Sequence, residues 1–129
     1  MKNQEIEGHY SRWYKNTQMI ANELNALTQA YGISFEQYLI LENLKQQTST
    51  PSQLARLFNT SMPAASRKIN LLQKKHYIRK LRGLEQSDQR LVEIKITPEG
   101  ESVFSQIKKQ LDDKYEYLDA AAREFVNIF

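Results

Sequence analysis

Apolar residues recur every three or four positions through the first quarter of the chain. They are Ile6, Tyr10, Trp13, Thr17 (semi-apolar), Ile20, Leu24, Leu27 and Tyr31. Steps that alternate between four and three give a period of about 3.5, which favours a helix that packs along another helix. Gly32 follows directly and is typical of the residue that ends a helix. We therefore expect one long amphipathic helix that stops near Gly32.

N-cap signatures mark the starts of three shorter helices. Ser34-Phe-Glu-Gln37 and Thr50-Pro-Ser-Gln53 match the capping box, in which the first and fourth residues bond each other's backbone N–H. We expect helices over 34–47, over 51–58 and, after the Ser61 cap, over 62–75. The positions expected to face inward are Phe35, Tyr38, Leu39, Leu41 and Leu44 in the first, Leu54, Ala55, Leu57 and Phe58 in the second, and Ala65, Ile69 and Leu72 in the third.

After His76 the period changes to two. Residues 77–82 and 91–96 predict strands, the second with Val92, Ile94 and Ile96 on one face, and the polar segment 83–89 predicts a hairpin loop. The two preceding helices are joined by a tight turn at Asn59-Thr60 and form a helix-turn-helix candidate. A helix-turn-helix followed by a β-hairpin predicts a winged helix.

Thr97-Pro98 predicts the start of a final helix. Its apolar positions are again three or four apart: Phe104, Ile107, Leu111, Tyr115, Leu118, Ala122, Phe125 and Phe129. The pair Asp112-Asp113 leaves open whether this helix is continuous or split. The expected fold class is mainly α with a small β-hairpin wing (α+β), a single domain over 1–129. A winged helix-turn-helix at 34–97 is flanked by dimerisation helices at 1–33 and 98–129, because two long one-sided helices would expose apolar surface on a monomer.

The composition argues against several classes of protein. The 129 residues contain no Cys, so disulfides, thiol redox sensing and Cys-ligated zinc are excluded. No stretch reaches the roughly 18 apolar residues of a membrane span, and the charged start lacks a signal-peptide core, so we expect a cytoplasmic protein. Without a Gly-rich phosphate loop, His-Glu-x-x-His or Gly-x-Ser-x-Gly, we expect neither an enzyme nor a cofactor. His9 and His76 lie on different elements, so we expect no metal site.

Positive charge is concentrated in the middle of the chain. Residues 51–97 hold ten Lys and Arg against three acidic residues, whereas the rest of the chain holds eight against twelve. A basic middle between acidic ends is typical of a nucleic-acid-binding face on a separate scaffold. A basic surface that contacts only solvent would give the same charge distribution. The local residue pattern must therefore distinguish it from a nucleic-acid-binding face.

The second helix of a helix-turn-helix lies in the DNA major groove. Opposite its inward residues, the chain places small side chains, which permit close approach, and hydrogen-bond donors. Arg67 could take a guanine or a phosphate, Asn70 could read adenine, and the lysines suit phosphates. The candidate DNA-binding residues in this helix and the adjoining strand are Ser61, Pro63, Ala64, Ser66, Arg67, Lys68, Asn70, Lys74 and Arg82.

The tip of the hairpin holds Gln86-Ser-Asp-Gln-Arg90. A narrow minor groove attracts an inserted Arg, and a nearby carboxylate can orient that side chain. Arg90 is therefore the candidate minor-groove contact, with Asp88 bracing it. The other candidate DNA-binding residues of this wing, 83–90, are Gln86, Ser87 and Gln89.

Together these motifs resemble the MarR family of multiple-antibiotic-resistance regulators. The similar segments are Ser61-x-x-Ala-Ala-Ser-Arg67 running into Leu72-Gln-Lys-Lys, Tyr77-Ile-Arg-Lys80, Asp88-Gln-Arg90 and Val92-Glu-Ile-Lys-Ile-Thr-Pro-Glu-Gly100. The resemblance covers residues 34–104 by motif and the whole chain by element order. It implies a homodimer with helix 62–75 in the major groove and Arg90 in the minor groove. Two positions depart from the family pattern, since His76 replaces a Gly that often needs positive φ, and Gln89 replaces the first Arg of Asp-Arg-Arg.

The resemblance also implies an effector. Family members often leave DNA when a small aromatic or lipophilic acid binds between the dimer helices and the winged domain. Tyr10, Trp13, Tyr14 and Tyr38 could line such a crevice, although membership of the core or the dimer interface is the simpler interpretation. Repression without any ligand stays open as well.

The function expected from these features is a sequence-specific double-stranded DNA-binding transcriptional regulator, a repressor that binds a pseudo-palindromic operator as a homodimer. One alternative is a winged helix used for protein contact, which would not need the basic middle segment or Arg90. Another is a PadR-like regulator, in which neither the N-terminal heptad helix nor the Asp-x-Arg wing is expected.

Overall fold

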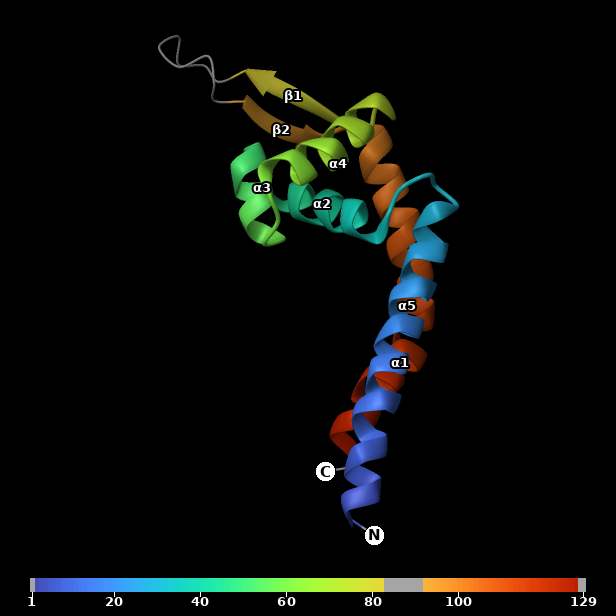
Figure 1. The fold of residues 1–129 in the computed structure, drawn as a ribbon. Coiled ribbons are helices and arrows are strands. Elements are labelled where there is room, and N and C mark those ends of the chain that lie inside the picture. Colours follow the sequence, from blue (N-terminus) through green and yellow to red (C-terminus); the bar gives the residue numbers. More distant parts are fainter. Residues whose placement is uncertain (1, 83–91, 128–129) are drawn as a thin grey trace.

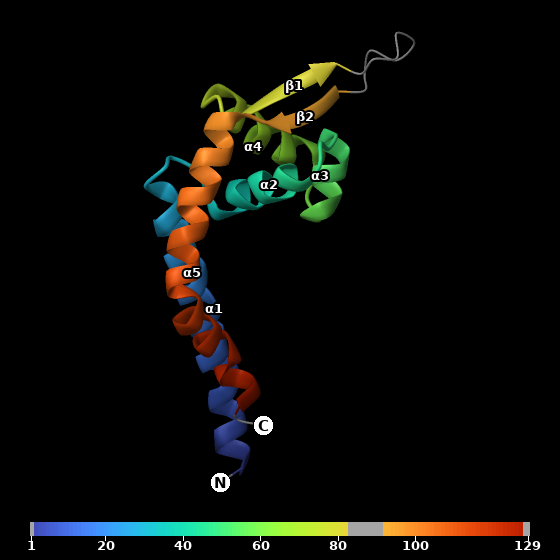
Figure 2. The same ribbon diagram turned by 180° about the vertical axis from the view of Figure 1, so that it is seen from behind.

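The computed structural model describes residues 2–82 and 92–127 and shows an arm joined to a body (Figure 1). The arm is made of the two longest helices, which lie side by side with both termini at its far end, and Figure 2 shows the same arrangement from behind. The body contains the shorter helices and the hairpin. The elements are α1 (Lys2–Gln29), α2 (Phe35–Gln46), α3 (Pro51–Leu57), α4 (Met62–Lys74), β1 (Ile78–Arg82), β2 (Val92–Ile96) and α5 (Pro98–Asn127). This order confirms the predicted fold class.

Each of the predicted N-caps is present. The Ser34 hydroxyl accepts a hydrogen bond from the Gln37 N–H (3.1 Å), and the Gln37 side-chain oxygen accepts one from the Ser34 N–H (2.7 Å). Thr50 and Gln53 form the same reciprocal pair at the start of α3, and Ser61 caps α4 through its hydroxyl. Because these caps satisfy amides that a helix leaves unpaired, they fix where α2, α3 and α4 begin.

Residues in the left-handed backbone region follow α1, α3 and α4. They are Gly32 (φ 76°), Asn59 (φ 49°) and His76 (φ 66°). At His76 the backbone N–H donates to the Gln73 carbonyl (2.9 Å), and the next N–H donates to the Leu72 carbonyl (3.1 Å), which is the Schellman arrangement. His76 therefore adopts the positive φ expected of a position where Gly is usual, although its β-carbon makes that region unfavourable.

The hairpin packs one face against the helices. β1 and β2 pair antiparallel from Ile78–Ile96 to Arg82–Val92. Ile94 and Ile96 are buried and Val92 is half-buried on the same side, as the alternation predicted. Ser49 extends the sheet by one bridge, exchanging two backbone hydrogen bonds with Ile94.

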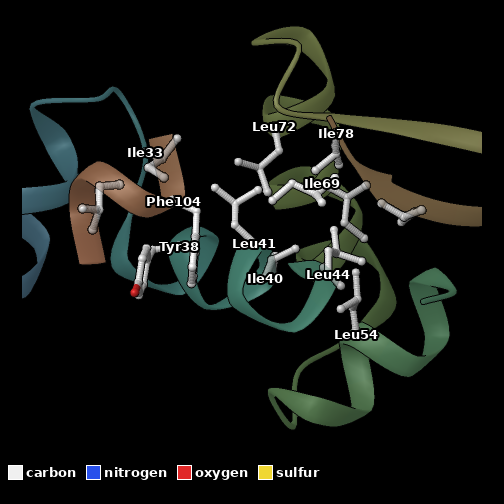
Figure 3. Close-up of a cluster of buried hydrophobic side chains, with 14 of the residues drawn as sticks. Ile33, Tyr38, Ile40, Leu41, Leu44, Leu54, Ile69, Leu72, Ile78 and Phe104 are labelled. Carbon is white, nitrogen blue, oxygen red and sulfur yellow. The ribbon is translucent and has the colours of Figure 1, made fainter. Parts of the chain in front are cut away.

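The core lies between α2, α3, α4 and the hairpin, and it continues to Phe104 and Ile107 of α5 and to Leu27 of α1 (Figure 3). Most of the predicted inward positions are buried, but Ile40 was missed and is 1% exposed, because α2 is covered on more than one side. The prediction for Leu57 was wrong, since this side chain is 55% exposed. At about 100° per residue, Leu57 falls to one side of the stripe formed by Leu54, Ala55 and Phe58.

The arm is held together by contacts of α5 with α1 and with the turn that follows α1. The Gln110 amide donates to the Tyr31 hydroxyl (2.7 Å), and the Lys114 ammonium lies 3.8 Å from the Glu23 carboxylate. α5 continues through Asp112-Asp113, so the final helix is continuous rather than split. Along its predicted apolar stripe, burial decreases away from the body: Phe104 and Ile107 are buried, Leu111 and Leu118 are half-buried and Tyr115 is exposed, while the side chains of Phe125 and Phe129 lie outside the described residues.

Over residues 2–82 and 92–127, no helix combines the length and the apolar character needed to cross a membrane.

Candidate nucleic-acid interface

α4 presents one buried and one exposed face. Ala65, Ile69 and Leu72 are buried against the body, as predicted. The other side of the helix, beginning at the Ser61 cap, carries small and polar residues together with the exposed apolar side chains of Met62 and Leu71. Ser61 and Pro63 are exposed, and Ala64 and Ser66 are half-buried. These four side chains are short, so the N-terminal end of the helix can come close to a base edge.

Two cations of α4 are available for a ligand. Arg67 and Lys74 are both exposed, and neither makes an ion pair or side-chain hydrogen bond with any residue in the described part of the chain. A guanidinium with all its donors unused can bind a guanine edge or a phosphate, and a lysine ammonium suits a phosphate. These two residues match their predicted placement.

Lys68 has a different environment from Arg67 and Lys74. Its ammonium lies 3.5 Å from the Glu36 carboxylate of α2, and the Lys68 side chain is only partly exposed. The backbone carbonyl of Lys68 also accepts a hydrogen bond from the Gln37 amide (3.2 Å). Lys68 thus links α4 to α2, and a DNA phosphate would compete with Glu36 for its charge.

Lys80 of β1 belongs to this surface, although the sequence reasoning did not select it. Its ammonium donates to the Asn70 side-chain oxygen at 3.1 Å. Adenine recognition by Asn requires that same oxygen to accept from the base, so Lys80 competes with adenine at Asn70. The strand alternation contained the signal, because Lys80 is two residues from the buried Ile78 and so faces α4.

The wing begins where the described ladder ends. Arg82 closes β1 opposite Val92, so its backbone is placed beside the body, while its side chain lies outside the described residues. The predicted wing residues Gln86, Ser87, Asp88, Gln89 and Arg90 also lie outside them, and their roles stay predictions.

The structure separates the four aromatic residues proposed for an effector crevice. Tyr38 is buried in α2, where its ring stacks on Phe104 with ring centroids 5.3 Å apart. Tyr10, Trp13 and Tyr14 are exposed on α1 and do not line the cleft that Tyr38 borders. Burial and then the nearby carboxylates of Glu42 and Asp112 raise the pKa of Tyr38 to about 12. Of the four residues, Tyr38 alone lines this cleft.

The histidines do not assemble a metal site in the described residues. His9 is buried in α1, and His76 is exposed after α4. Within residues 2–82 and 92–127, no three His, Asp or Glu side chains come together in a group that could hold a metal ion.

A capped helix-turn-helix, a β-hairpin and a basic exposed face on the second helix define a winged-helix protein of the type that regulates transcription. The family model described as "MarR family" matches residues 31–95, and the chain belongs to this family. The resemblance of the motifs is thereby confirmed, and the PadR-like alternative is wrong.

Solved structures share the fold at low sequence identity. A MarR variant from E. coli complexed with operator DNA has a TM-score of 0.71 and 21% identity, covering 81% of this chain and 75% of that chain. The transcriptional regulator BldR from Sulfolobus solfataricus has a TM-score of 0.70 and 19% identity, covering 91% and 81%. MepR, a transcription regulator of the Staphylococcus aureus multidrug efflux pump MepA, has a TM-score of 0.69 and 19% identity, covering 86% and 82%. No curated protein matches the chain by sequence.

Proposed function

We propose that the chain is a sequence-specific double-stranded DNA-binding regulator, a repressor and not an enzyme, that binds a pseudo-palindromic operator as a homodimer. The observation that carries this proposal is the exposed face of α4, where Arg67 and Lys74 make no ion pair and no side-chain hydrogen bond with any described residue. In this proposal α4 enters the major groove. The wing 83–90 enters the minor groove through Arg90, with Asp88 orienting it.

The basic residues around α4 are suited to different parts of the DNA. Arg67, near the N-terminal end of the helix, is suited to a base edge, whereas Lys74 and Lys80, further along, are suited to phosphates. Ser61, Pro63, Ala64 and Ser66 are small enough to let the helix approach the groove closely. Lys68 contributes less to DNA binding than its charge suggests, because Glu36 already neutralises it.

The arm supports the proposed homodimer. Tyr14 is 60% exposed and Tyr115 is 61% exposed, both on helices that already pack against each other. Large exposed aromatic side chains on a pair of long helices favour burial against a second copy. A two-fold dimer predicts half-sites about 10 bp apart, centre to centre.

Selection from a library of random-sequence duplexes tests the proposal. The full chain is mixed with the library at two salt concentrations, and the retained duplexes are sequenced. We expect an enriched pseudo-palindrome with half-site centres about 10 bp apart. Replacing both cations (Arg67→Ala with Lys74→Ala) should weaken binding at least about tenfold and lower the salt slope by about 1 to 2, since both contacts are lost.

Lys109→Ala is the matched control, because Lys109 is an exposed lysine of α5 that lies outside the proposed interface. This variant should keep the affinity and the salt slope of the unmodified chain. Weak, unselective binding by the unmodified chain would contradict the proposal.

That result would favour a winged helix used for protein contact, for which the exposed apolar residues Leu57 and Met62 beside the helix-turn-helix are the specific support. Release of DNA by a small-molecule effector and a cytoplasmic location complete the proposed function.

A further inference from the structure

A cavity of about 660 Å³ lies at the base of the hairpin, between the two strands and the first turn of α5. Figure 2 shows the start of α5 beside this end of the hairpin. Within the described residues, the lining includes no residue of α4, so the cavity is separate from the exposed face of that helix. Its polar lining consists of His76, Arg79, Lys95, Thr97, Glu99 and Glu101.

The strands contribute two cations that face each other. Arg79 of β1 is paired with Lys95 of β2 in the register of the hairpin, and both side chains are exposed. Directly opposed side chains start about 4.5–5.5 Å apart, and like charges at such a pair destabilise a sheet. Neither cation makes an ion pair or a side-chain hydrogen bond with any described residue. An anion bound between them would therefore relieve a repulsion that the unbound chain carries.

The first turn of α5 contributes carboxylates to the same cavity. Glu101 lies 3.9 Å from the Lys45 ammonium of α2, which already offers it a counter-charge. Glu99 is exposed and makes no ion pair with any residue in the ranges 2–82 and 92–127. The cations of the strands and the carboxylate of Glu99 thus line one cavity without neutralising each other.

This separation of charge favours a ligand that carries both signs. A simple anion would be attracted by Arg79 and Lys95 but repelled by Glu99, and a simple cation would meet the opposite combination. A zwitterion can place each of its charges beside the opposite charge of the protein. Pockets of about 300–1,000 Å³ are typical sites for small ligands, so the cavity is large enough for such a molecule.

We propose that the cavity binds a small zwitterion, with its carboxylate held by Arg79 and Lys95 and its ammonium held by Glu99. The ligand class is an ω-amino acid or a dipeptide, in which the two charged ends lie several bonds apart. A guanidinium can bind a carboxylate through two parallel N–H donors, and the lysine ammonium adds a further donor. The inference goes beyond the proposed function, because the site requires neither DNA nor a second copy of the chain.

Three probes with one six-carbon chain and different charges test the selectivity. They are 6-aminohexanoate, hexanoate and hexylamine, each titrated into the full chain near neutral pH and followed by NMR chemical shifts. We expect 6-aminohexanoate to bind at least about tenfold more tightly than the other two, because only this probe satisfies both groups of charges. Hexanoate or hexylamine that binds as tightly as 6-aminohexanoate would overturn the proposal.

Single substitutions assign the two ends of the ligand. Arg79→Met removes the charge of an unbranched side chain, so 6-aminohexanoate and hexanoate should bind more weakly while hexylamine is spared. Glu99→Gln should weaken 6-aminohexanoate and hexylamine and spare hexanoate. For 6-aminohexanoate we expect a loss of at least about tenfold in each variant. If its affinity is unchanged by either substitution, the assigned site is wrong.

Arg56→Met and Glu116→Gln are the matched controls. They remove an exposed cation of α3 and an exposed carboxylate of α5, and neither residue lines the cavity. Both variants should keep the affinities of the unmodified chain for all three probes. A loss in the controls as large as the loss in Arg79→Met and Glu99→Gln would show attraction by overall charge alone, and the proposal would fail.

Arg79→Glu separates ligand binding from folding. A glutamate opposite Lys95 replaces the like-charge pair with an ion pair, so the urea midpoint of the unbound chain should rise. The affinity for 6-aminohexanoate should nevertheless fall at least about tenfold, because the carboxylate of the ligand now meets a negative charge. A lower midpoint together with the lower affinity would mean that Arg79 has a structural role, contrary to the proposal.

A DNA phosphate is another anion that Arg79 and Lys95 could bind. The Arg79→Met variant is therefore also titrated with the duplex enriched by selection. We expect its duplex affinity to match that of the unmodified chain, because the cavity is separate from the exposed face of α4. Weaker duplex binding with an unchanged affinity for 6-aminohexanoate would show that the pair contacts phosphates and would refute the zwitterion site.

Discussion

The body and the arm bury their apolar side chains to different extents. In the body, Leu41, Leu54, Ile69 and Leu72 come from three different helices and are almost fully enclosed. In the arm, two helices of 28 and 30 residues pack along each other, and they leave several large aromatic side chains exposed. These residues are Tyr10, Trp13, Tyr14, Tyr115 and Tyr117.

This difference indicates where each region obtains its stability. A pair of helices has one shared seam, so side chains that point away from the seam find no third element to cover them. The body has a sheet and three helices, so α2 is covered on several sides by other elements. The body thus buries its apolar side chains within one chain. In the proposed dimer, the arm buries its exposed aromatic side chains against a second copy.

The largest effect that separates the regions is expected from Leu41→Ala. Leu41 is 0% exposed at the centre of the body, so the truncation leaves a cavity and should lower the free energy of unfolding by about 2–5 kcal/mol. Urea unfolding at a fixed protein concentration measures the loss. Leu57→Ala is the control, because its exposed side chain should contribute within about 0.5 kcal/mol. Similar losses in both variants would contradict the enclosed core of the body.

A smaller effect is expected when the arm is changed at its surface. Tyr14→Asp places a charge on the exposed aromatic surface of α1, and it should weaken self-association at least about tenfold, because central aromatic residues dominate such interfaces. Sedimentation at several concentrations measures the dissociation constant. Leu57→Asp makes the same kind of change on the body and should leave that constant unaltered. If Tyr14→Asp dimerises as tightly as the unmodified chain, this part of the arm is not the interface.

The parts of the fold that were predictable from the sequence are those set by neighbouring residues. The caps at Ser34, Thr50 and Ser61 depend on side chains three positions apart, and each was predicted where the structure has it. The strand alternation and the Thr97-Pro98 start of α5 are local for the same reason. Leu57 was predicted wrongly because a seven-residue helix has too few apolar positions to define its buried stripe.

The candidate DNA-binding surface was only partly predictable. Arg67 and Lys74 were placed correctly, because helical periodicity alone sets the exposed face of α4. The pairing of Lys68 with Glu36 and of Lys80 with Asn70 depends on how α4 packs against α2 and β1, which no local pattern specifies. In the same way, the surroundings of Tyr38 include residues of α5, which is distant from α2 in sequence.

The smallest effect is expected from His76→Gly, a substitution in the body that should change its stability without changing the arm. His76 has a φ of 66°, and Gly adopts this region without the steric cost that a β-carbon adds. The backbone carbonyl that accepts the Thr97 hydroxyl hydrogen bond (2.6 Å) is kept in the variant. After the greater freedom of Gly in the unfolded chain is subtracted, the free energy of unfolding should rise by about 0.5–1 kcal/mol.

Gln73→Gly, one helical turn earlier, is the matched control for that gain. Gln73 is an exposed residue inside α4, so Gly there should lower the free energy of unfolding by about 1 kcal/mol. Urea unfolding should therefore give opposite signs for two Gly substitutions three residues apart. A loss at His76 would show that its side chain contributes more than the strained backbone costs. Because both positions lie in the body, the dissociation constant of the dimer should stay the same in both variants, and a change in it would mean that the body takes part in the interface.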